Sequence, residues 1–337
     1  MAYNEEQITL AHGGGGRLYH QLVEEIFLPA FDNPHLRALT DSALCPCSGG
    51  TLAMTTDSYV VRPRFFPGGD VGRLAVCGTV NDLTMSGATP AYLTVGMILE
   101  AGLSIAELKH ICCSMAVAAK EAGVWIVTGD TKVVEKGRGD GIYINTAGVG
   151  LFSTAQKPFS QKVSAGDKIL VSGTVGDHGL CVLAARENID FDPPLQSDVA
   201  PLQGLAAMVR EAVPEIHAMR DPTRGGLAAV ANEWAGQGLS IAIDEEAVPV
   251  SAPVRAAGEL LGIDPLYVAN EGKLVLAVRG EDVQQALEAL REHPLGRDAA
   301  VIGEVRADHL GKAYVETRYG SSRLLDMPYA EQLPRIC

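Results

Sequence analysis

The order of apolar and polar positions in the first half of the chain predicts a mixture of strands and helices. Residues 51–61, TLAMTTDSYVV, are rich in β-branched and apolar residues and predict a strand. The PGGD loop follows, and apolar positions in residues 71–80 predict a helix that is capped by Asp70. Ser104 and Glu107 form the capping-box pattern of a second helix. The segments VWIVTGDTKVV and GIYINTAGVGLF predict two further strands.

The second half continues this alternation. Strands are predicted at KILVSG, LSIAID, KLVLAV and AAVIGEV, and helices near residues 178–188, 201–212 and 281–292 and after DPTRGG. The whole chain is therefore of the mixed α and β class.

Two polar segments divide the chain. The segment AQKPFSQKVSAGDK places a domain boundary near residue 155. The last segment, MPYAEQLPRIC, has no amphipathic period and contains two prolines, so it predicts an extended tail. We predict an N-terminal domain in residues 1–155, a C-terminal domain in residues 156–325 and a tail in residues 326–337.

A glycine run precedes the first helical pattern. The segment AHGGGGRLYHQLVEEIF joins four successive glycines to a helix-forming stretch: Gly13, Gly14, Gly15 and Gly16. Glycine loses more conformational freedom on ordering than any other residue, so a simple turn of four glycines is costly. We expect this run to stay mobile until something orders it.

Composition and charge narrow the class of protein. A chain of 337 residues with 47% hydrophobic content is long enough for two packed domains. The net charge of -14 opposes binding to a phosphate backbone, so we expect no nucleic-acid partner. No apolar run reaches the length of a membrane span and the N-terminus is polar and acidic. We therefore expect a cytoplasmic protein with no membrane association.

Three aspartates fall at or near the ends of predicted elements, where loops can gather them around a hard cation. They are Asp57 in TTDS, Asp82 in VNDL and Asp130 in TGDTK. Any one of them alone is as readily a turn or capping residue. Together with the glycine loops they predict a site for Mg²⁺ and a nucleotide, with all three aspartates as metal ligands.

Several residues near these aspartates suit phosphate groups. Lys132 and Asp130 share one face of an extended strand, in the GDTK segment that also contains Thr131. From spacing alone, an ordinary surface lysine is the simpler interpretation of Lys132. Backbone N–H groups at predicted helix beginnings attract anions, and two glycine pairs suit such a position. These are Gly68 with Gly69, and Gly225 with Gly226 directly after Arg224. Neither pair matches a Walker P-loop.

Glu271, in NEGKLVLAV, lies just before a predicted strand and is a candidate general base, although a loop glutamate is more often a solvated surface group.

The chain has seven cysteines, an odd number that opposes a disulfide framework. Cys337 is distinctive among them because it is the last residue. A thiol on a flexible tail can carry a group between two sites, whereas the alternative is a frayed end without a role. Cys112 and Cys113 lie within a predicted helix, and we expect them to be small core residues.

The segments TTDSYVVRPRFFPGGDVGRLAVCGTVNDLTMSGA, GDTKVV, RDPTRGGLAAVANE, NEGKLVLAV and the terminal PRIC together resemble the HypE family of hydrogenase maturation proteins over nearly the whole chain. The short TTD, ND and GD elements are similar to those of the superfamily of aminoimidazole ribonucleotide synthetase and selenophosphate synthetase, and the terminal PRIC narrows the resemblance to HypE. Selenophosphate synthetases carry a catalytic Cys or selenocysteine and a Lys near the glycine run. Here the run lies between His12 and Arg17, which disfavours selenium chemistry.

The resemblance implies a two-domain synthetase-like fold. An N-terminal α/β domain would contribute strands to a β-barrel core shared by a homodimer, and a C-terminal α+β domain would close the nucleotide cleft. It also implies that the enzyme uses ATP to dehydrate an S-carbamoyl group on Cys337 into a thiocyanate, which supplies the cyanide ligand of the [NiFe]-hydrogenase iron. The carbamoyltransferase HypF would load the cysteine, and a HypC–HypD scaffold would receive the cyanide.

The resemblance further implies roles for the candidate residues. The carbamoyl oxygen would attack the γ-phosphate, and loss of phosphate with deprotonation of nitrogen would leave the thiocyanate. Asp57, Asp82 and Asp130 would hold the metal, and the glycine run would fold over the nucleotide. Lys132 would stabilise the developing phosphate charge and Glu271 would take the proton.

Two alternatives remain open from the sequence. One is another ATP-using synthetase of the superfamily that phosphorylates an amide or metabolite, with the tail irrelevant. The other is a non-enzymatic thiol scaffold that carries iron on Cys45, Cys47 and Cys337. An ATPase assay, metal analysis and removal of the last three residues distinguish them.

Overall fold

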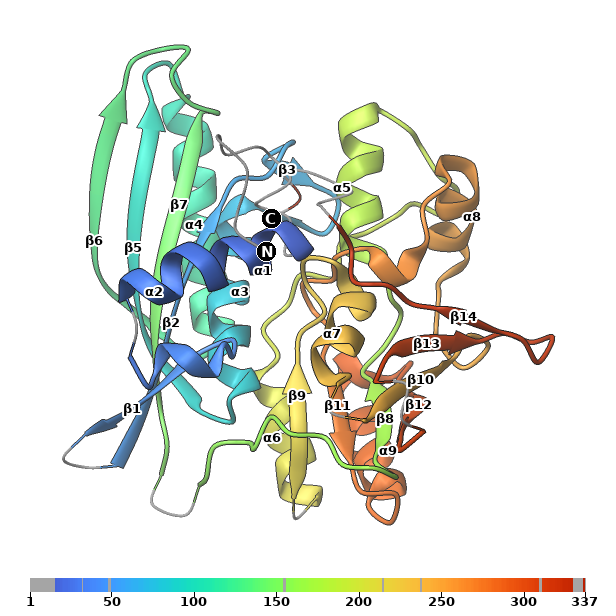
Figure 1. Ribbon diagram of the computed structural model, residues 1–337. Helices are drawn as coiled ribbons and strands as arrows, with labels where there is room; N and C mark the ends of the chain where they lie inside the picture. Colours follow the sequence, from blue (N-terminus) through green and yellow to red (C-terminus); the bar gives the residue numbers. More distant parts are fainter. Residues whose placement is uncertain are drawn as a thin grey trace.

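The computed structural model describes residues 16–329 and Ile336, apart from residues 32, 48–49, 154–155, 214, 237 and 309–310. Figure 1 shows two halves of mixed α and β structure side by side, each built around its own large sheet. We propose that the boundary lies near residue 155, because the first sheet ends at Leu151 and the second begins at Lys168. Among the described residues, no helix is both long and apolar enough to span a bilayer.

The first sheet has five strands in the order β1-β2-β7-β5-β6, with only the β5–β6 pair parallel. Helices α3 and α4 pack on one face, and α4 is the crossover between the two parallel strands. The opposite face exposes Met54, Tyr92 and Ile98. The bounds are β1 Ala43–Cys47, β2 Gly50–Tyr59, α3 Val71–Met85, β5 Thr89–Glu100, α4 Ile105–Glu121, β6 Trp125–Val134 and β7 Ile142–Leu151.

The second sheet has seven strands in the order β14-β13-β10-β12-β8-β11-β9 and is covered on both faces. Alternate residues of the fully buried strand β11 belong to two different apolar cores, one with helix α7 and one with helices α6 and α9. The strand bounds are β8 Lys168–Val171, β9 Ile216–Arg220, β10 Ser240–Asp244, β11 Val275–Val278, β12 Ala300–Arg306, β13 Ala313–Glu316 and β14 Ser322–Leu324. The helix bounds are α5 Asp177–Glu187, α6 Gln203–Ala212, α7 Gly226–Trp234, α8 Ala252–Leu261 and α9 Val283–Glu292.

The remaining elements are outside the two sheets and the helices that cover them. A helical segment at the beginning of the described chain consists of α1, a π-helical turn and α2, and two-residue strands β3 and β4 precede α3. Helices α5 and α8 pack on each other beside the second sheet. The bounds are α1 Arg17–Leu22, the π turn Val23–Phe27, α2 Leu28–Phe31, β3 Phe65–Phe66 and β4 Gly69–Asp70, with 3-10 turns at Leu36–Ala38, Pro265–Tyr267 and Pro294–Gly296.

Most predicted elements are confirmed. The Asp70 carboxylate accepts hydrogen bonds from the N–H groups of Gly72 at 2.7 Å and Arg73 at 3.1 Å, so Asp70 caps α3 as predicted. Ser104 caps α4 by accepting from Ala106 N–H at 3.2 Å. The reciprocal half of the predicted capping box is replaced by an ion pair that Glu107 forms with Arg64 at 3.1 Å.

Two sequence interpretations need correction. Cys112 and Cys113 are exposed, because α4 packs on the sheet through Ile111, Met115 and Ala118 and turns the two cysteines outward. The long central strand β5 has no counterpart among the predicted elements. Its early proline opposes a strand assignment, and in the structure a register shift just after Pro90 accommodates the ring.

Candidate active site

Five acidic side chains from both halves converge where the two halves meet. We call Asp41, Asp57, Asp82, Asp221 and Glu271 the carboxylate cluster. Asp57 lies on β2 and Asp82 on α3, whereas Asp41 precedes β1, Asp221 follows β9 and Glu271 precedes β11. Each of the five side chains is buried or half-buried. The structure thus brings together Asp57 and Asp82, two of the three aspartates predicted to share a site. Glu271 lies in the same cluster.

Hydrogen bonds hold the first-half members of the carboxylate cluster in place. The Thr55 hydroxyl lies 2.8 Å from Asp82 Oδ2 and 2.9 Å from the Asp41 carbonyl oxygen. The Tyr59 hydroxyl donates to Asp57 Oδ2 at 3.1 Å. These contacts arise from alternation along β2, because Thr55, Asp57 and Tyr59 share the face of the sheet that α3 covers.

Burial and mutual repulsion raise the pKa values of these carboxyl groups. Burial, and then the charges of Asp57, Asp221 and Asp41, raise the pKa of Asp82 well above its usual range. Burial and the neighbouring acids likewise raise the pKa of Asp221 and of Glu271 well above theirs. Burial raises the pKa of Asp41 to about 6, against the opposing effect of Arg220. The cluster therefore favours binding of protons or of a cation.

Two buried oxygen atoms of this cluster, Asp41 Oδ2 and Asp221 Oδ2, have no hydrogen-bond partner among the described residues. Such atoms fit an oxygen-seeking divalent cation. Within the described part of the chain, however, no three His, Cys, Asp or Glu side chains already form a metal-binding group. Mg²⁺ is commonly held by one or two carboxylates together with substrate phosphates and water, so these residues suit a metal that arrives with a nucleotide.

Two arginines flank the carboxylate cluster. Arg220, at the end of β9, forms ion pairs with Asp41 and, at 3.2 Å, with Glu233. The charge of Arg224 partly offsets the effect of burial on the pKa of Asp57 and Glu271, so its guanidinium lies near both. Arg224 also stacks over the Tyr19 ring of α1, 5.6 Å from the ring centroid. This residue thus places a positive charge between the first helix and the cluster.

A buried ion pair fixes the backbone of Glu271. Asp198 accepts hydrogen bonds from the N–H groups of Glu271 at 3.1 Å and Gly272 at 3.3 Å, and from Lys273 Nζ at 3.0 Å. Burial alone would raise the pKa of Asp198, but the charge of Lys273 and the hydrogen bonds from Glu271 N–H and Lys273 Nζ outweigh it and lower that pKa. Asp198 is therefore ionised at neutral pH, and it holds the loop that carries Glu271.

The predicted glycine pairs are places of close backbone approach. A Cβ atom on Gly68 would lie 2.6 Å from the Ser197 carbonyl oxygen, and one on Gly226 would lie 2.6 Å from the Val268 carbonyl oxygen. Gly69 packs in the same way against Val199, and Gly225 has a positive φ at the beginning of α7. All four glycines therefore let neighbouring segments pack closely, and their predicted contact with a nucleotide stays a prediction.

Asp130 and Lys132 do not join the carboxylate cluster within one chain. Both lie on β6, form an ion pair at 3.7 Å and are about three-quarters exposed. The strand pairing connects Asp130 to Gly96, Asn145 and then Ser58, which is on the face opposite to Asp57. Thr131 lies between them on the same edge strand.

Described residues of the predicted C-terminal tail contact both halves. Pro328 accepts a hydrogen bond through its carbonyl oxygen from Arg17 N–H of α1 at 2.9 Å, and a Cβ atom on Gly16 would clash with that oxygen. Ile336 is only 2% exposed, and it belongs to the apolar core that contains Tyr59. Its carbonyl oxygen lies 2.9 Å from His178 Nε2. The predicted residues Gly13, Gly14, Gly15 and Cys337 lie outside the described residues.

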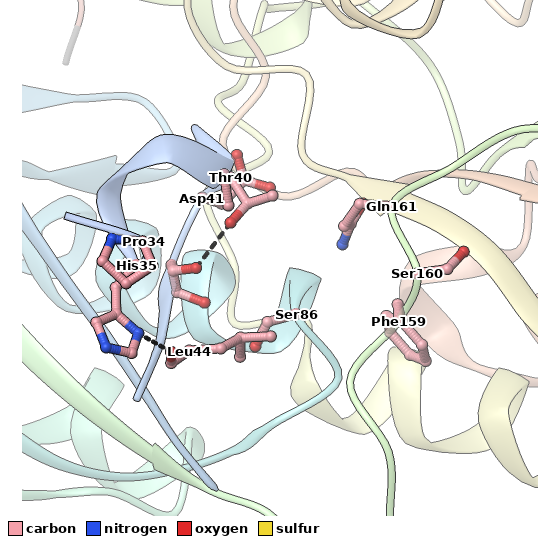
Figure 2. Close-up of a pocket in the computed structure, with 11 residues that line it drawn as sticks. Pro34, His35, Thr40, Asp41, Leu44, Ser86, Phe159, Ser160 and Gln161 are labelled. Atoms are coloured by element: carbon pink, nitrogen blue, oxygen red, sulfur yellow. Dashed lines mark hydrogen bonds between the residues drawn. The ribbon is translucent and has the colours of Figure 1, made fainter. Parts of the chain in front are cut away.

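A cavity of about 210 Å³ opens beside Asp41. Figure 2 shows Pro34, His35 and Leu44 on one side of it and residues 159–161 on the other. The cavity does not include the other four members of the carboxylate cluster.

Sequence reasoning missed Asp41, His178, Asp198 and Lys273. A signal for Asp41 was present, because Thr40-Asp41-Ser42 repeats the tripeptide around Asp57. The other three lack a local motif, since their partners are distant in sequence.

Comparisons with known proteins agree with this architecture. The AIR synthase related protein N-terminal domain matches residues 40–152, and the corresponding C-terminal domain matches residues 164–316. The carbamoyl dehydratase HypE of Azotobacter vinelandii is 50% identical over 331 residues, which are 98% of this chain and 97% of that protein. This chain belongs to the HypE family.

Solved structures of HypE proteins share this fold. A crystal structure of HypE in complex with ATP is 48% identical, with a TM-score of 0.82 over 98% of this chain and 100% of that one. A crystal structure of a HypE–HypF complex contains a chain that is 48% identical, with a TM-score of 0.84 over 91% of this chain and 99% of that one. The resemblance and the two-domain mixed α/β fold expected from it are confirmed.

Proposed function

We propose that this chain is an ATP-dependent carbamoyl dehydratase that converts an S-carbamoyl group on Cys337 into a thiocyanate for the iron centre of [NiFe]-hydrogenase. The observation that carries the proposal is the burial of Ile336 in the apolar core that also contains Tyr59, the hydrogen-bond partner of Asp57, because Cys337 is the next residue. Membership of the HypE family supports the same reaction, since its relatives are carbamoyl dehydratases.

The reaction needs a good leaving group and a base. The carbamoyl oxygen attacks the γ-phosphate of ATP, and ADP leaves. The C–O bond of the phosphorylated group then breaks, and phosphate departs with that oxygen. Nitrogen loses two protons, one to Glu271 and one to the departing phosphate, and the S–C≡N group is complete. Glu271 accepts a proton, since it is buried and its raised pKa makes its ionised form a strong base.

ATP with Mg²⁺ fits the carboxylate cluster. Asp57 and Asp82 would bind the metal, and Asp41 and Asp221 offer unpartnered oxygens beside them. The bound metal supplies charge neutralisation at the phosphates. Arg224, whose charge reaches Asp57 and Glu271, adds positive charge next to that position. The glycine run that ends at Gly16 precedes α1 and would cover the nucleotide.

A second copy of the chain would bring Asp130, Thr131 and Lys132 to the site. Within the described residues β6 pairs only with β5, and its exposed side chains include Trp125 and Val133. An open edge with exposed apolar side chains favours pairing with another sheet. We therefore propose a homodimer in which the two N-terminal sheets form a shared β-barrel-like core, and in which Asp130 and Lys132 act on the partner's nucleotide.

HypF is the proposed donor of the carbamoyl group, since a related HypE has been crystallised with HypF. A HypC–HypD scaffold is the proposed acceptor of the cyanide. Transfer in both directions requires the segment that carries Cys337 to move away from the carboxylate cluster.

The decisive experiment follows the mass of the C-terminal peptide. The full chain is incubated with HypF, carbamoyl phosphate and MgATP, and we expect a carbamoyl gain followed by loss of water. Cys337→Ala should abolish both changes while ATP binding persists, whereas Cys112→Ala, which removes an exposed thiol on α4, should behave as the unmodified chain. Carbamoyl gain without water loss in the unmodified chain would refute the proposal. Bound iron without ATP turnover would favour the scaffold alternative.

A further inference from the structure

One fully buried histidine has no place in the proposed chemistry. His178 lies on α5 and its ring is packed edge-on against Phe66, with ring centroids 5.4 Å apart. Its Nδ1 lies 2.8 Å from Ser197 Oγ, and its Nε2 lies 2.9 Å from the Ile336 carbonyl oxygen. A side chain of the second half thus contacts the backbone of the residue before Cys337.

The directions of these hydrogen bonds follow from chemistry. A carbonyl oxygen has no proton, so His178 Nε2–H donates to Ile336. Burial lowers the pKa of His178, and the neutral ring then accepts at Nδ1 from the Ser197 hydroxyl. Ser197 Oγ in turn accepts from Val199 N–H at 3.2 Å. Because the Ile336 carbonyl group can only accept, the tautomer of His178 is the one with its proton on Nε2.

The Ile336 side chain is held as firmly as its carbonyl group. It is 2% exposed and belongs to the apolar core of Phe66, Val182, Val199 and Ala269. A buried branched side chain in a packed interior is sensitive to shape, so the position favours isoleucine over smaller or polar residues.

This arrangement shares an apolar core with residues that lie next to members of the carboxylate cluster. The same apolar core contains Tyr59, whose hydroxyl donates to Asp57, and Ala269, two residues before Glu271. The Cα atom of Cys337 is about 3.8 Å from that of Ile336, because consecutive Cα atoms are separated by this distance. Holding Ile336 therefore restricts the position of Cys337 relative to this core.

We propose that His178, Ser197 and the apolar residues around Phe66 form a seat for the penultimate residue, and that His178 is a positioning residue for Cys337. The inference rests on the proposed function and adds to it. Recognition falls on the carbonyl group and side chain of Ile336, so the Cys337 side chain is free to change from thiol to carbamoyl to cyano group. One seat can thus accept the tail at every stage.

The test uses full-length chains loaded by HypF and carbamoyl phosphate. Water loss is then started with MgATP and followed by mass spectrometry, normalised to the carbamoylated fraction. His178→Ala should slow the maximal rate about tenfold or more and leave the ATP concentration for half-maximal rate unchanged. His178→Gln, whose side-chain N–H can still donate, should recover most of the rate. His217→Ala is the matched control, because it also removes a histidine with a 2.8 Å Nδ1 contact, here to Asp167.

Two further measurements protect the test from a folding defect. Ile336→Ala changes only the tail and should slow water loss about 10- to 100-fold, as expected for loss of a buried side chain. Combining it with His178→Ala should add little, since both act through one seat. Iodoacetamide should alkylate the Cys337 peptide faster in both single variants than in the unmodified chain.

The outcomes separate the two proposals. Equal rates in His178→Ala, Ile336→Ala and the unmodified chain would overturn the seat. Multiplying effects in the double variant, or a raised half-maximal ATP concentration in His178→Ala, would also overturn it. Absence of water loss in the unmodified chain would defeat the proposed function, whereas faster alkylation of the two variants would still support the seat.

Discussion

Lys273→Met tests the buried ion pair that supports Glu271. The Lys273 and Asp198 side chains are 11% and 4% exposed, and their charged atoms lie 3.0 Å apart. Removing one member of a buried pair leaves the other charge unpaired and typically costs about 3–5 kcal/mol. Unfolding in urea has a slope of about 3 kcal/mol per molar for a domain of this size, so the midpoint should fall by about 1 to 1.7 M.

Lys168→Met is the matched control. Lys168 pairs with Glu304 at the surface, where the two side chains are 36% and 32% exposed and Arg306 remains as a second partner for Glu304. Exposed pairs contribute less than about 1 kcal/mol, so the midpoint should fall by less than about 0.3 M. Circular dichroism during urea titration measures both variants. Equal midpoints would show that burial does not control the strength of the Lys273 pair.

The dependence on pH gives a second check of the same pair. Asp198 has a lowered pKa in the folded chain, so it contributes stability above its unfolded pKa of about 3.9 and loses that contribution as the pH falls through the folded value. The difference between Lys273→Met and the unmodified chain should therefore be largest near neutral pH and shrink below about pH 4. A difference that grows in acid would contradict the assigned ionisation of Asp198.

Three further predictions address the carboxylate cluster and the exposed edge. Asp82→Asn should abolish MgATP binding in calorimetry. It should also raise the urea midpoint of the nucleotide-free chain at pH 7. The reason is that the pKa of this buried carboxyl group is raised in the folded chain, so the group opposes folding at pH values above its unfolded pKa. Glu271→Gln should retain ATP binding and slow water loss about 10²- to 10⁴-fold, and the unmodified rate should rise as the pH passes through the raised pKa of Glu271. Val133→Lys on β6 should convert a dimer into a monomer in sedimentation and reduce ATP turnover, whereas an unchanged sedimentation coefficient would exclude this edge from the interface.

The sequence allowed much of the local structure to be predicted, because local patterns determine it. The cap at Asp70 and the strands around Asp57 and Asp130 depend on neighbouring residues. The position of Asp130 relative to Asp57 depends instead on strand order, in which β7 and β5 lie between β2 and β6. No local pattern contains that order.

Long-range contacts explain the residues that were missed. His178 meets Ile336 across 158 positions of the chain, and Lys273 meets Asp198 across 75. Each looks like an ordinary helix or strand residue until the fold brings its partner near. The raised pKa of Glu271 has the same origin, since burial and distant carboxylates cause it.

The hydrogen bond from Arg17 to Pro328 joins the beginning of α1 to the segment that follows β14. Any displacement that takes Pro328 away leaves the first amide of α1 without its acceptor, at a cost of about 0.5–1.5 kcal/mol until water replaces it. The stability of the first turn of α1, directly after the glycine run, therefore depends on whether Pro328 is in place.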